Sequence, residues 1–348
     1  MVVKEQWIDL FSDTVTRPTS EMRSFMLQAE VGDEQLREDP SVNRLNREVS
    51  ILLGKEDALF LPSGTMCNQI AFRAHCSHGD EIIMDRTAHT RHYETGGPAA
   101  LSGACMYPLD GERGIFTAAQ VEEAIRPDGH HFPRSRVLLV EQTSNLGGGS
   151  VWPLDTIREV CALARDRGLA CHMDGARLMN AVVAAGIPAR QYADLFDSVW
   201  IDFSKGLGAP MGAVLAGSGS FIQQAWRLKH QFGGAMRQAG IMAAGALYAL
   251  EHHVERLAQD HANARLLAEG LQEIPGLHVE PVETNMVFFD VSGLNMTAAR
   301  FQELLLDRGV RVSTLGKTRV RAVTHLDVSR AQAKEALNII RDFTERGI

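Results

Sequence analysis

Short apolar runs, separated by stretches with helical spacing, recur along the first two thirds of the chain. Turn-forming or polar residues bound these runs, as they bound β-strands. The runs lie at 58–61, 81–84, 137–140, 169–173, 198–201 and 213–216, and helical spacing is found at 66–76 and 154–167. Near-continuous apolar strands are typical of a parallel sheet that is buried on both faces. We therefore predict an α/β fold with a mostly parallel sheet.

The pattern changes after residue 240. A long helical stretch at 240–271 is followed by strand-like segments that alternate with helices, which predicts a small α+β domain. The segments lie at 279, 286–289 and 320–323, and the helices at 298–308 and 331–341. We divide the chain into an N-terminal arm (1–20), a large domain (21–250) and a small C-terminal domain (251–348).

Composition and charge exclude several classes of protein. The 348 residues are 45% hydrophobic and 22% charged, which is ordinary globular usage and unlike that of fibrous or disordered chains. The 35 Lys and Arg against 43 Asp and Glu give a net charge of −8, the opposite of what a nucleic-acid binder needs. No segment approaches the ~20 apolar residues of a membrane span, and the start lacks a signal-peptide pattern. We expect a cytoplasmic protein without nucleic-acid or membrane partners.

Polar residues follow several of the predicted strands at the points where the strands end. Ligands of open α/β sheets bind at the carboxyl ends of strands. Ser63-Gly64-Thr65 follows the first strand and opens a helix, where backbone N–H groups and the positive helix end favour an anion such as a phosphate. The same residue types also cap ordinary helices, so this segment alone is weak evidence for a phosphate site.

Asp174 and Lys205 follow two later strands. Lys205 lies between Ser204 and Gly206 after an apolar strand, where partial desolvation favours the neutral amine that attacks a carbonyl group. Asp174 is placed to hold the proton of a pyridinium nitrogen. A single loop lysine is usually solvated. A Schiff-base lysine, an aspartate for a ring nitrogen and a phosphate cup are together what pyridoxal 5′-phosphate requires, and we predict this cofactor.

Seven segments, in their order along the chain, resemble the threonine aldolase family of fold-type-I pyridoxal-phosphate enzymes. The segments are Ser12–Pro18, Pro62–Met66, Ala88-His89, His172–Arg177, Ser204–Pro210, Gly233–Gln238 and Thr324–Asp327. The resemblance extends from about Asp9 to the C-terminus. It implies an aspartate aminotransferase-like large domain with a mostly parallel sheet, a smaller α+β C-terminal domain, and an N-terminal arm that contributes to the active site.

The resemblance also implies roles for individual residues. Lys205 forms the covalent link to the cofactor, His89 stacks on its ring and His131 approaches the substrate hydroxyl group. The residues implied in cofactor binding are Ser63, Gly64, Thr65, His89, Asp174, Arg177, Lys205, Lys229 and Arg237, and those implied in binding the substrate carboxylate are Ser12, Arg177 and Arg321. The family supplies some phosphate ligands across a subunit boundary, which implies a homodimer or a homotetramer.

The function implied is that of an aldolase acting on a small amino-acid substrate. Such an enzyme cleaves the Cα–Cβ bond of a β-hydroxy-α-amino acid and releases glycine and an aldehyde. The alternatives are another β-eliminating lyase or a transferase on the same scaffold, and a cofactor-binding protein without catalysis. No metal is predicted, because His89-x-x-His92 lacks the acidic neighbours of a zinc helix and the five cysteines form no C-x-x-C pair.

The chain departs from the family pattern at several positions. The family usually has an Asp-x-Tyr-Gly-like stretch where this chain has Leu36 and Arg37, and Ser144 stands where a histidine is common. The altered segment is expected to face the substrate side chain, so we include Leu36 and Arg37 among the substrate-binding residues. The preferred β-hydroxy amino acid, the choice between His89 and His131 as the base, and the choice between dimer and tetramer stay open on the sequence alone.

Overall fold

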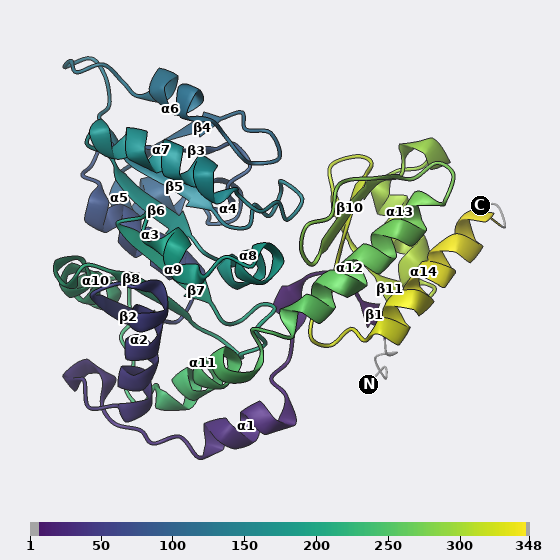
Figure 1. Ribbon diagram of the computed structural model, residues 1–348, viewed down its shortest axis with the longest axis horizontal. Coiled ribbons are helices and arrows are strands. Elements are labelled where there is room, and N and C mark those ends of the chain that lie inside the picture. Colours follow the sequence, from purple (N-terminus) through teal and green to yellow (C-terminus); the bar gives the residue numbers. More distant parts are fainter. Residues whose placement is uncertain (1–6, 346–348) are drawn as a thin grey trace. The chain divides into compact units, whose positions relative to one another are not determined.

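The computed structural model describes residues 7–345. The chain divides into two compact units, one formed by Pro18–Val254 and the other by Met1–Arg17 together with Glu255–Ile348 (Figure 1). Residues 7–17, which belong to the segment treated above as an arm, thus group with the smaller unit. Among the described residues, no helix is long and apolar enough to cross a membrane.

A seven-stranded sheet forms the centre of the larger unit. Its order is β2 (Asp57–Leu61), β8 (Ala213–Gly217), β7 (Ser198–Asp202), β6 (Ala170–Asp174), β5 (Ser135–Glu141), β3 (Glu81–Asp85) and β4 (Cys105–Leu109). Only β8 runs antiparallel to its neighbours. Every residue of β3, β7 and β8 is buried, and because successive side chains point to opposite faces, both faces of the sheet are covered. The mostly parallel α/β fold predicted from the apolar runs is confirmed.

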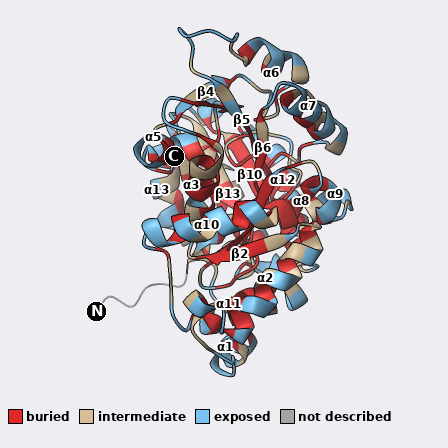
Figure 2. Cartoon of the chain, turned by 90° about the vertical axis from the view of Figure 1, so that its left-hand side faces the viewer, coloured by how far each residue is buried: buried red, intermediate tan, exposed pale blue. Residues whose placement is uncertain are grey.

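Helices with one apolar face cover this sheet. In α7 (Leu154–Asp166) the buried residues Ile157, Val160, Cys161 and Ala164 recur at helical spacing. In Figure 2, β2 is red, whereas the outer face of α10 is pale blue. The other helices of this unit are α1 (Ser20–Leu27), α2 (Pro40–Leu53), α3 (Gly64–His75), α4 (His89–His92), α5 (Gly97–Ser102), α6 (Ala118–Ala124), α8 (Leu178–Ala185), α9 (Ala189–Ala193), α10 (Gly219–Gln231), α11 (Gly240–His252) and the short 3₁₀ helix η2 (Glu34–Leu36).

The smaller unit is an α+β structure with its own apolar core. Its antiparallel sheet has the order β12 (Ser313–Leu315), β13 (Arg319–Val323), β10 (Met286–Asp290) and β9 (His278–Val279). A second, parallel pair joins β1 (Ile8–Asp9) to β11 (Val310–Arg311). The helical elements are α12 (Leu257–Gln272), α13 (Ala298–Leu306), α14 (Arg330–Glu345) and the 3₁₀ helices η1 (Asp13–Val15) and η3 (Ser292–Leu294).

Several elements differ from the sequence predictions, and two of them have a clear physical reason. The helix predicted at 240–271 is two helices, α11 and α12, and the division between the two units falls between them. The edge strand β4 was not predicted, because only Leu109 among its residues is buried and Pro108 interrupts the strand pattern. An edge strand that faces solvent lacks the continuous apolar run by which the central strands are recognised.

Candidate active site

Three buried carboxylates end neighbouring strands of the large sheet. Glu141 ends β5, Asp174 ends β6 and Asp202 ends β7, and Glu141 is paired in register with Asp174. Because these strands are parallel, their carboxyl ends lie at the same edge of the sheet. This edge is the candidate site, and Lys205 follows Asp202 there by three residues.

Lys205 is held at this edge by an ion pair. Its Nζ lies 2.8 Å from Oδ2 of Asp202, and the two side chains are only 16% and 5% exposed. The other oxygen of Asp202 accepts hydrogen bonds from the backbone N–H and the hydroxyl group of Ser204, at 2.8 and 2.7 Å. The lysine is therefore a largely desolvated side chain in a fixed position, not a solvated loop lysine.

Asp174 is buried and accepts hydrogen bonds on both carboxylate oxygens. Oδ1 accepts from the backbone N–H of Ala176 at 3.0 Å, and Oδ2 from the side-chain amide of Asn68 at 2.8 Å. Each oxygen has two lone pairs, so acceptor capacity remains for a further N–H group. A carboxylate held in this way is suited to a protonated ring nitrogen.

His89 lies next to two further carboxylates. Its Nδ1 is 3.0 Å from Oε1 of Glu94, and its backbone N–H donates to Oε2 of Glu141 at 2.6 Å. Burial lowers the pKa of His89, but the hydrogen bond to Glu94 and the charges of Asp174, Glu141 and Glu94 outweigh burial and raise it. Burial, reinforced by the charge of Asp174, raises the pKa of Glu141 to about 7.

The N-terminus of α3 supplies an anion site. The hydroxyl group of Ser63 caps the N–H of Met66, which leaves the first N–H groups of the helix, at Gly64 and Thr65, for a ligand. A Cβ at position 64 would lie 2.2 Å from the indole of Trp200, so the close approach of this helix start to β7 requires glycine. Trp200 also lies 5.8 Å from Nζ of Lys205, measured to the ring centroid, and so contacts both parts of the site.

These residues fit pyridoxal 5′-phosphate by the chemistry of their donor set. A desolvated lysine can bond to the aldehyde, a buried carboxylate can hold the ring nitrogen, and free helix N–H groups can bind the phosphate. Lys205, Asp174, Gly64 and Thr65 all belong to the larger unit, and each lies at a strand end or at the helix start that follows a strand.

The predicted carboxylate ligands lie in both units. In the smaller unit, Arg321 donates from Nε to the hydroxyl group of Ser313 at 3.0 Å and from Nη2 to the carbonyl of Phe11 at 3.3 Å, next to Ser12 in the chain. The hydroxyl group of Ser12 accepts from the N–H of Thr14. In the larger unit, Arg177 is buried at the start of α8. Ser12 and Arg321 thus occur together within one unit.

Lys229 and Arg237 differ in exposure. Lys229 is fully buried, forms an ion pair with Glu34 and donates to the carbonyl of Phe60 at 2.8 Å. Burial lowers its pKa, although Glu34 opposes this effect. The side chain of Arg237 is 64% exposed and pairs with Asp33 at 2.7 Å. The charge of Lys229 is therefore balanced inside this chain, and Arg237 is the one of the two that reaches the surface.

Three predicted site residues have no contact with the sheet-edge cluster among the interactions of the described residues. They are His131, Leu36 and Arg37. His131 is exposed in the loop that precedes β5, at the amino ends of the strands, and its ring contacts that of His130. Leu36 is 67% exposed. Arg37 has a φ of 58°, a left-handed conformation that favours glycine, and its guanidinium lies 5.5 Å from the centre of the Trp226 ring.

Several residues of the cluster were not predicted from the sequence. Glu141 and Asp202 end apolar strands as Asp174 does, so the strand-end rule that found Asp174 also applies to them. Asn68 and Glu94 carry no such signal, because one lies inside a helix and the other in a loop, and only the fold brings them to Asp174 and His89.

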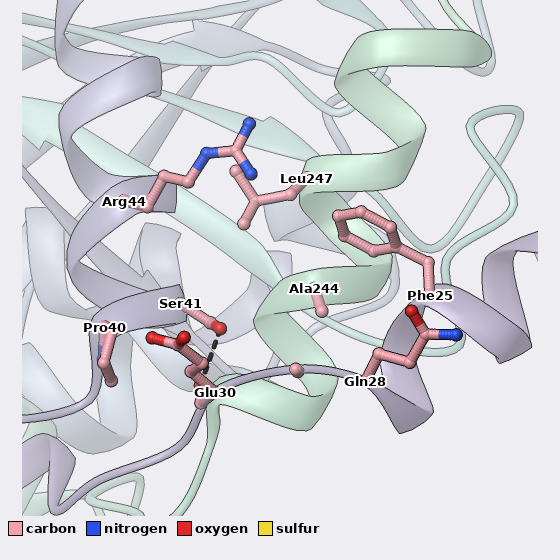
Figure 3. Close-up of a pocket in the computed structure, with 9 residues that line it drawn as sticks. Phe25, Gln28, Glu30, Pro40, Ser41, Arg44, Ala244 and Leu247 are labelled. Carbon is pink, nitrogen blue, oxygen red and sulfur yellow. Dashed lines mark hydrogen bonds between the residues drawn. The ribbon is translucent and has the colours of Figure 1, made fainter.

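A separate cavity of about 280 Å³ lies among α1, α2 and α11 (Figure 3). Arg44, its most prominent charged side chain, already pairs with Glu48 and Glu251, and the hydroxyl group of Ser41 donates to the carbonyl of Glu30 at 2.7 Å. None of the predicted site residues lines it. This cavity is therefore distinct from the sheet-edge cluster.

Comparisons with known proteins show the family of this chain by sequence and its fold by structure. The profile of the beta-eliminating lyase family matches residues 9–293. The low-specificity L-threonine aldolase of Escherichia coli K12 is 42% identical over 340 residues, which cover 97% of this chain and all of that protein. The Leishmania major threonine aldolase structure has a TM-score of 0.85 at 19% identity over 97% of this chain and 99% of that one. A solved structure of SPT with PLP has a TM-score of 0.74 at 17% identity over 98% and 87% of the two chains.

Proposed function

We propose that this chain, which belongs to the threonine aldolase family, is a pyridoxal-phosphate-dependent lyase that cleaves the Cα–Cβ bond of β-hydroxy-α-amino acids to glycine and an aldehyde. The observation that supports it most is the placement of Lys205 and Asp174 at neighbouring strand ends, in the same unit as the free N-terminus of α3. When bound, the cofactor supplies an electron sink for the charge left on Cα.

Within the larger unit, each residue has a separate task. Lys205 bonds to the cofactor, and Asp174 holds the proton of its ring nitrogen. The N–H groups of Gly64 and Thr65, with the hydroxyl of Ser63, bind the phosphate. His89 would stack on the ring of the cofactor, and its imidazole offers a nitrogen for proton transfer.

The substrate carboxylate requires cationic partners. Arg177 and Arg321, with the hydroxyl group of Ser12, are the residues we assign to it. A guanidinium fork binds a carboxylate through two parallel hydrogen bonds and so fixes its orientation. An amino acid whose carboxylate is fixed in this way would present one Cα substituent in a set direction to the cofactor, and this orientation would select the bond that breaks.

Product analysis tests the function. Purified protein loaded with pyridoxal 5′-phosphate and supplied with threonine, allo-threonine or phenylserine is expected to release glycine and the matching aldehyde in equal amounts. A β-eliminating lyase would release a keto acid and ammonia instead. A keto acid without glycine would replace the proposed function by the alternative, and no product from any of these substrates would favour a non-catalytic protein.

We further propose that the active form is a homodimer or a homotetramer. In this family some phosphate ligands come from a neighbouring subunit. Arg237 supports this assignment in this chain because its side chain is exposed, whereas Lys229 is occupied by Glu34 within its own chain.

The segment at Leu36 and Arg37 is our candidate for substrate selectivity. Arg37 lines an open cavity of about 540 Å³ together with Gln35, Trp226, Arg227, His230 and Gln231, and the exposed Leu36 precedes it in the chain. The lining contains two arginines and no carboxylate. We therefore propose that the enzyme prefers a β-hydroxy amino acid that is bulkier than threonine or carries a negative charge.

Replacing Leu36→Tyr is expected to shift selectivity toward threonine or allo-threonine. The added phenol supplies a polar partner near the substrate's β-substituent, and one such hydrogen bond is worth ~1 kcal/mol, or about fivefold in relative kcat/KM. The measurement is kcat/KM for threonine, allo-threonine, phenylserine and β-hydroxyaspartate. The matched control is Leu27→Tyr, which makes the same change at an exposed leucine outside this segment, on α1. An unchanged rank order in Leu36→Tyr would refute this role.

A further inference from the structure

The orientation of the Asn68 side chain is determined by its neighbours. The indole Nε1 of Trp200, which can only donate, lies 2.7 Å from Oδ1 of Asn68. The amide oxygen therefore faces Trp200, and the NH₂ group faces away from it. The two hydrogens of that group go to Oε1 of Glu94 and Oδ2 of Asp174, each at 2.8 Å. Both carboxylate oxygens must consequently be acceptors.

A neutral histidine supports the same orientation. Nε2 of His172 lies 3.1 Å from Oδ1 of Asn68, and its Nδ1 lies 2.8 Å from the hydroxyl of Ser198. Burial lowers the pKa of His172 to about 3, so the ring is neutral at physiological pH. Because Oδ1 of Asn68 can only accept, the proton of His172 is on Nε2, and Ser198 donates to Nδ1.

Glu94 receives three hydrogen bonds. Its side chain is fully buried, with Asn68 and His89 at Oε1 and the amide of Gln69, at 2.6 Å, on Oε2. The side-chain amides of Asn68 and Gln69 donate to Oε1 and Oε2 respectively, so Glu94 acts as an acceptor on both oxygens. Nδ1 of His89, 3.0 Å from Oε1, must then carry its proton toward Glu94. Nε2 is left as the atom of the ring that can take up a proton.

The close approach of His89, Glu94 and Asp174 is explained by hydrogen bonds without a metal ion. Ligand atoms of His89, Glu94 and Asp174 lie within 4.8 Å of one another, a spacing that also suits a cation. The NH₂ group of Asn68 bridges the two carboxylates at hydrogen-bonding distance from each, however, and so takes the place of a cation between them.

We propose that Glu94, oriented by Asn68 and Gln69, is the positioning residue of His89: it keeps the imidazole proton on Nδ1 and strengthens Nε2 as a proton acceptor in the active site. The arrangement follows the general logic of a base oriented by a buried carboxylate. The placement of His89 in the active site rests on the proposed function, whereas the proton position on its ring does not.

The charged groups that face His89 come from three elements. Glu94 follows α4 in the chain, Glu141 ends β5 and Asp174 ends β6, and all three raise the pKa of His89 against the effect of burial. Of the three, only Glu94 bonds to the ring, since Glu141 accepts from the backbone N–H of His89. Glu141→Gln therefore removes a charge from the same cluster without removing the bond to the ring, and is the matched control for Glu94→Gln.

The first experiment uses the cofactor-free protein. Long-range ¹H–¹⁵N correlation spectra of the unaltered chain, with the His89 signals assigned by their loss in His89→Asn, are expected to show the Nδ1–H tautomer at high pH. In Glu94→Gln the pKa of His89 is expected to fall by about 1–2 units, the usual effect of removing one adjacent charge. Glu141→Gln is expected to lower it by less than half as much, and Glu94→Asp, which keeps the charge, by less than Glu94→Gln.

The second experiment measures the pH profile of the loaded enzyme. The neutral imidazole is the active form, so activity rises as pH passes upward through the pKa of His89. A lower pKa in Glu94→Gln therefore moves the acid limb of kcat/KM to lower pH, while the weaker acceptor reduces kcat about threefold to tenfold with little change in KM.

Two results would overturn the proposal. One is an Nε2–H tautomer in the unaltered protein, a measurement that needs no variant to fold. The other is a pKa of His89 that falls as far in Glu141→Gln as in Glu94→Gln. That result would mean that the net charge of the cluster, and not the hydrogen bond from the ring to Glu94, determines the pKa of His89. If the product assay fails while the tautomer and the pKa shift are as expected, only the proposed function is wrong.

Discussion

Replacing Lys205→Ala is expected to abolish the yellow colour of the loaded enzyme and to lower kcat on the order of 10³-fold or more, the scale on which loss of a covalent nucleophile slows other enzymes. The lysine is the largely buried amine at the sheet edge, paired with Asp202 at 2.8 Å, and alanine leaves no group there to bond the cofactor. The measurements are the visible spectrum and glycine release from a β-hydroxy amino acid.

The covalent link itself can be located in the unaltered protein. Borohydride reduction followed by peptide mapping is expected to find the cofactor on Lys205. Lys317→Ala, at an exposed turn of the smaller unit, is the control and should keep both colour and activity. Cofactor attached to another lysine after reduction would contradict the assignment, and so would an active, coloured Lys205→Ala protein.

Replacing Arg321→Ala is expected to weaken use of the substrate far more than binding of the cofactor. Removing one partner of a buried, hydrogen-bonded charge pair costs ~2–5 kcal/mol, which corresponds to a loss of about 30-fold to several thousandfold in kcat/KM. Arg321 is held in place by Ser313 and by the carbonyl of Phe11, so its guanidinium is already oriented before a ligand arrives. The measurements are kcat/KM for the amino acid and the dissociation constant of the cofactor.

The same strand offers a matched control. Arg319 lies two residues earlier on β13, pairs with Glu280 and stacks at 4.2 Å over the Phe288 ring. Arg319→Ala removes an equal charge from the same strand and is expected to leave kcat/KM nearly unchanged. Equal losses in the two variants, or a parallel loss of cofactor and substrate binding in Arg321→Ala, would mean that Arg321 is not the carboxylate ligand.

The sequence alone was enough to predict the central sheet and the family. Strands such as β3 and β7 are buried along their whole length, and that burial leaves a continuous apolar run in the sequence. Asp174 and Lys205 could be singled out because residues that follow parallel strands meet at one edge. These features depend on local pattern and chain order, so no knowledge of distant contacts is needed to find them.

Contacts between distant segments could be decided only by the tertiary structure. Lys229 is a basic residue on a helix in the sequence, but the fold buries it against Glu34, 195 residues away. Residues 8–9 give no strong strand signal, yet they pair with 310–311 and so belong to the smaller unit. Pairings of this kind depend on where the chain returns in space, which short-range periodicity does not record.

The hydrogen-bonded residues around His89 show most clearly what the sequence could predict and what only the tertiary structure decided. The sequence pattern identifies His89 and Asp174 separately, because each belongs to a segment that resembles the family. It does not identify Asn68 and Glu94, which connect them. Their importance comes from buried polar atoms that must find partners inside the protein, and this requirement arises only once helix α3, the loop after α4 and the sheet edge are packed together.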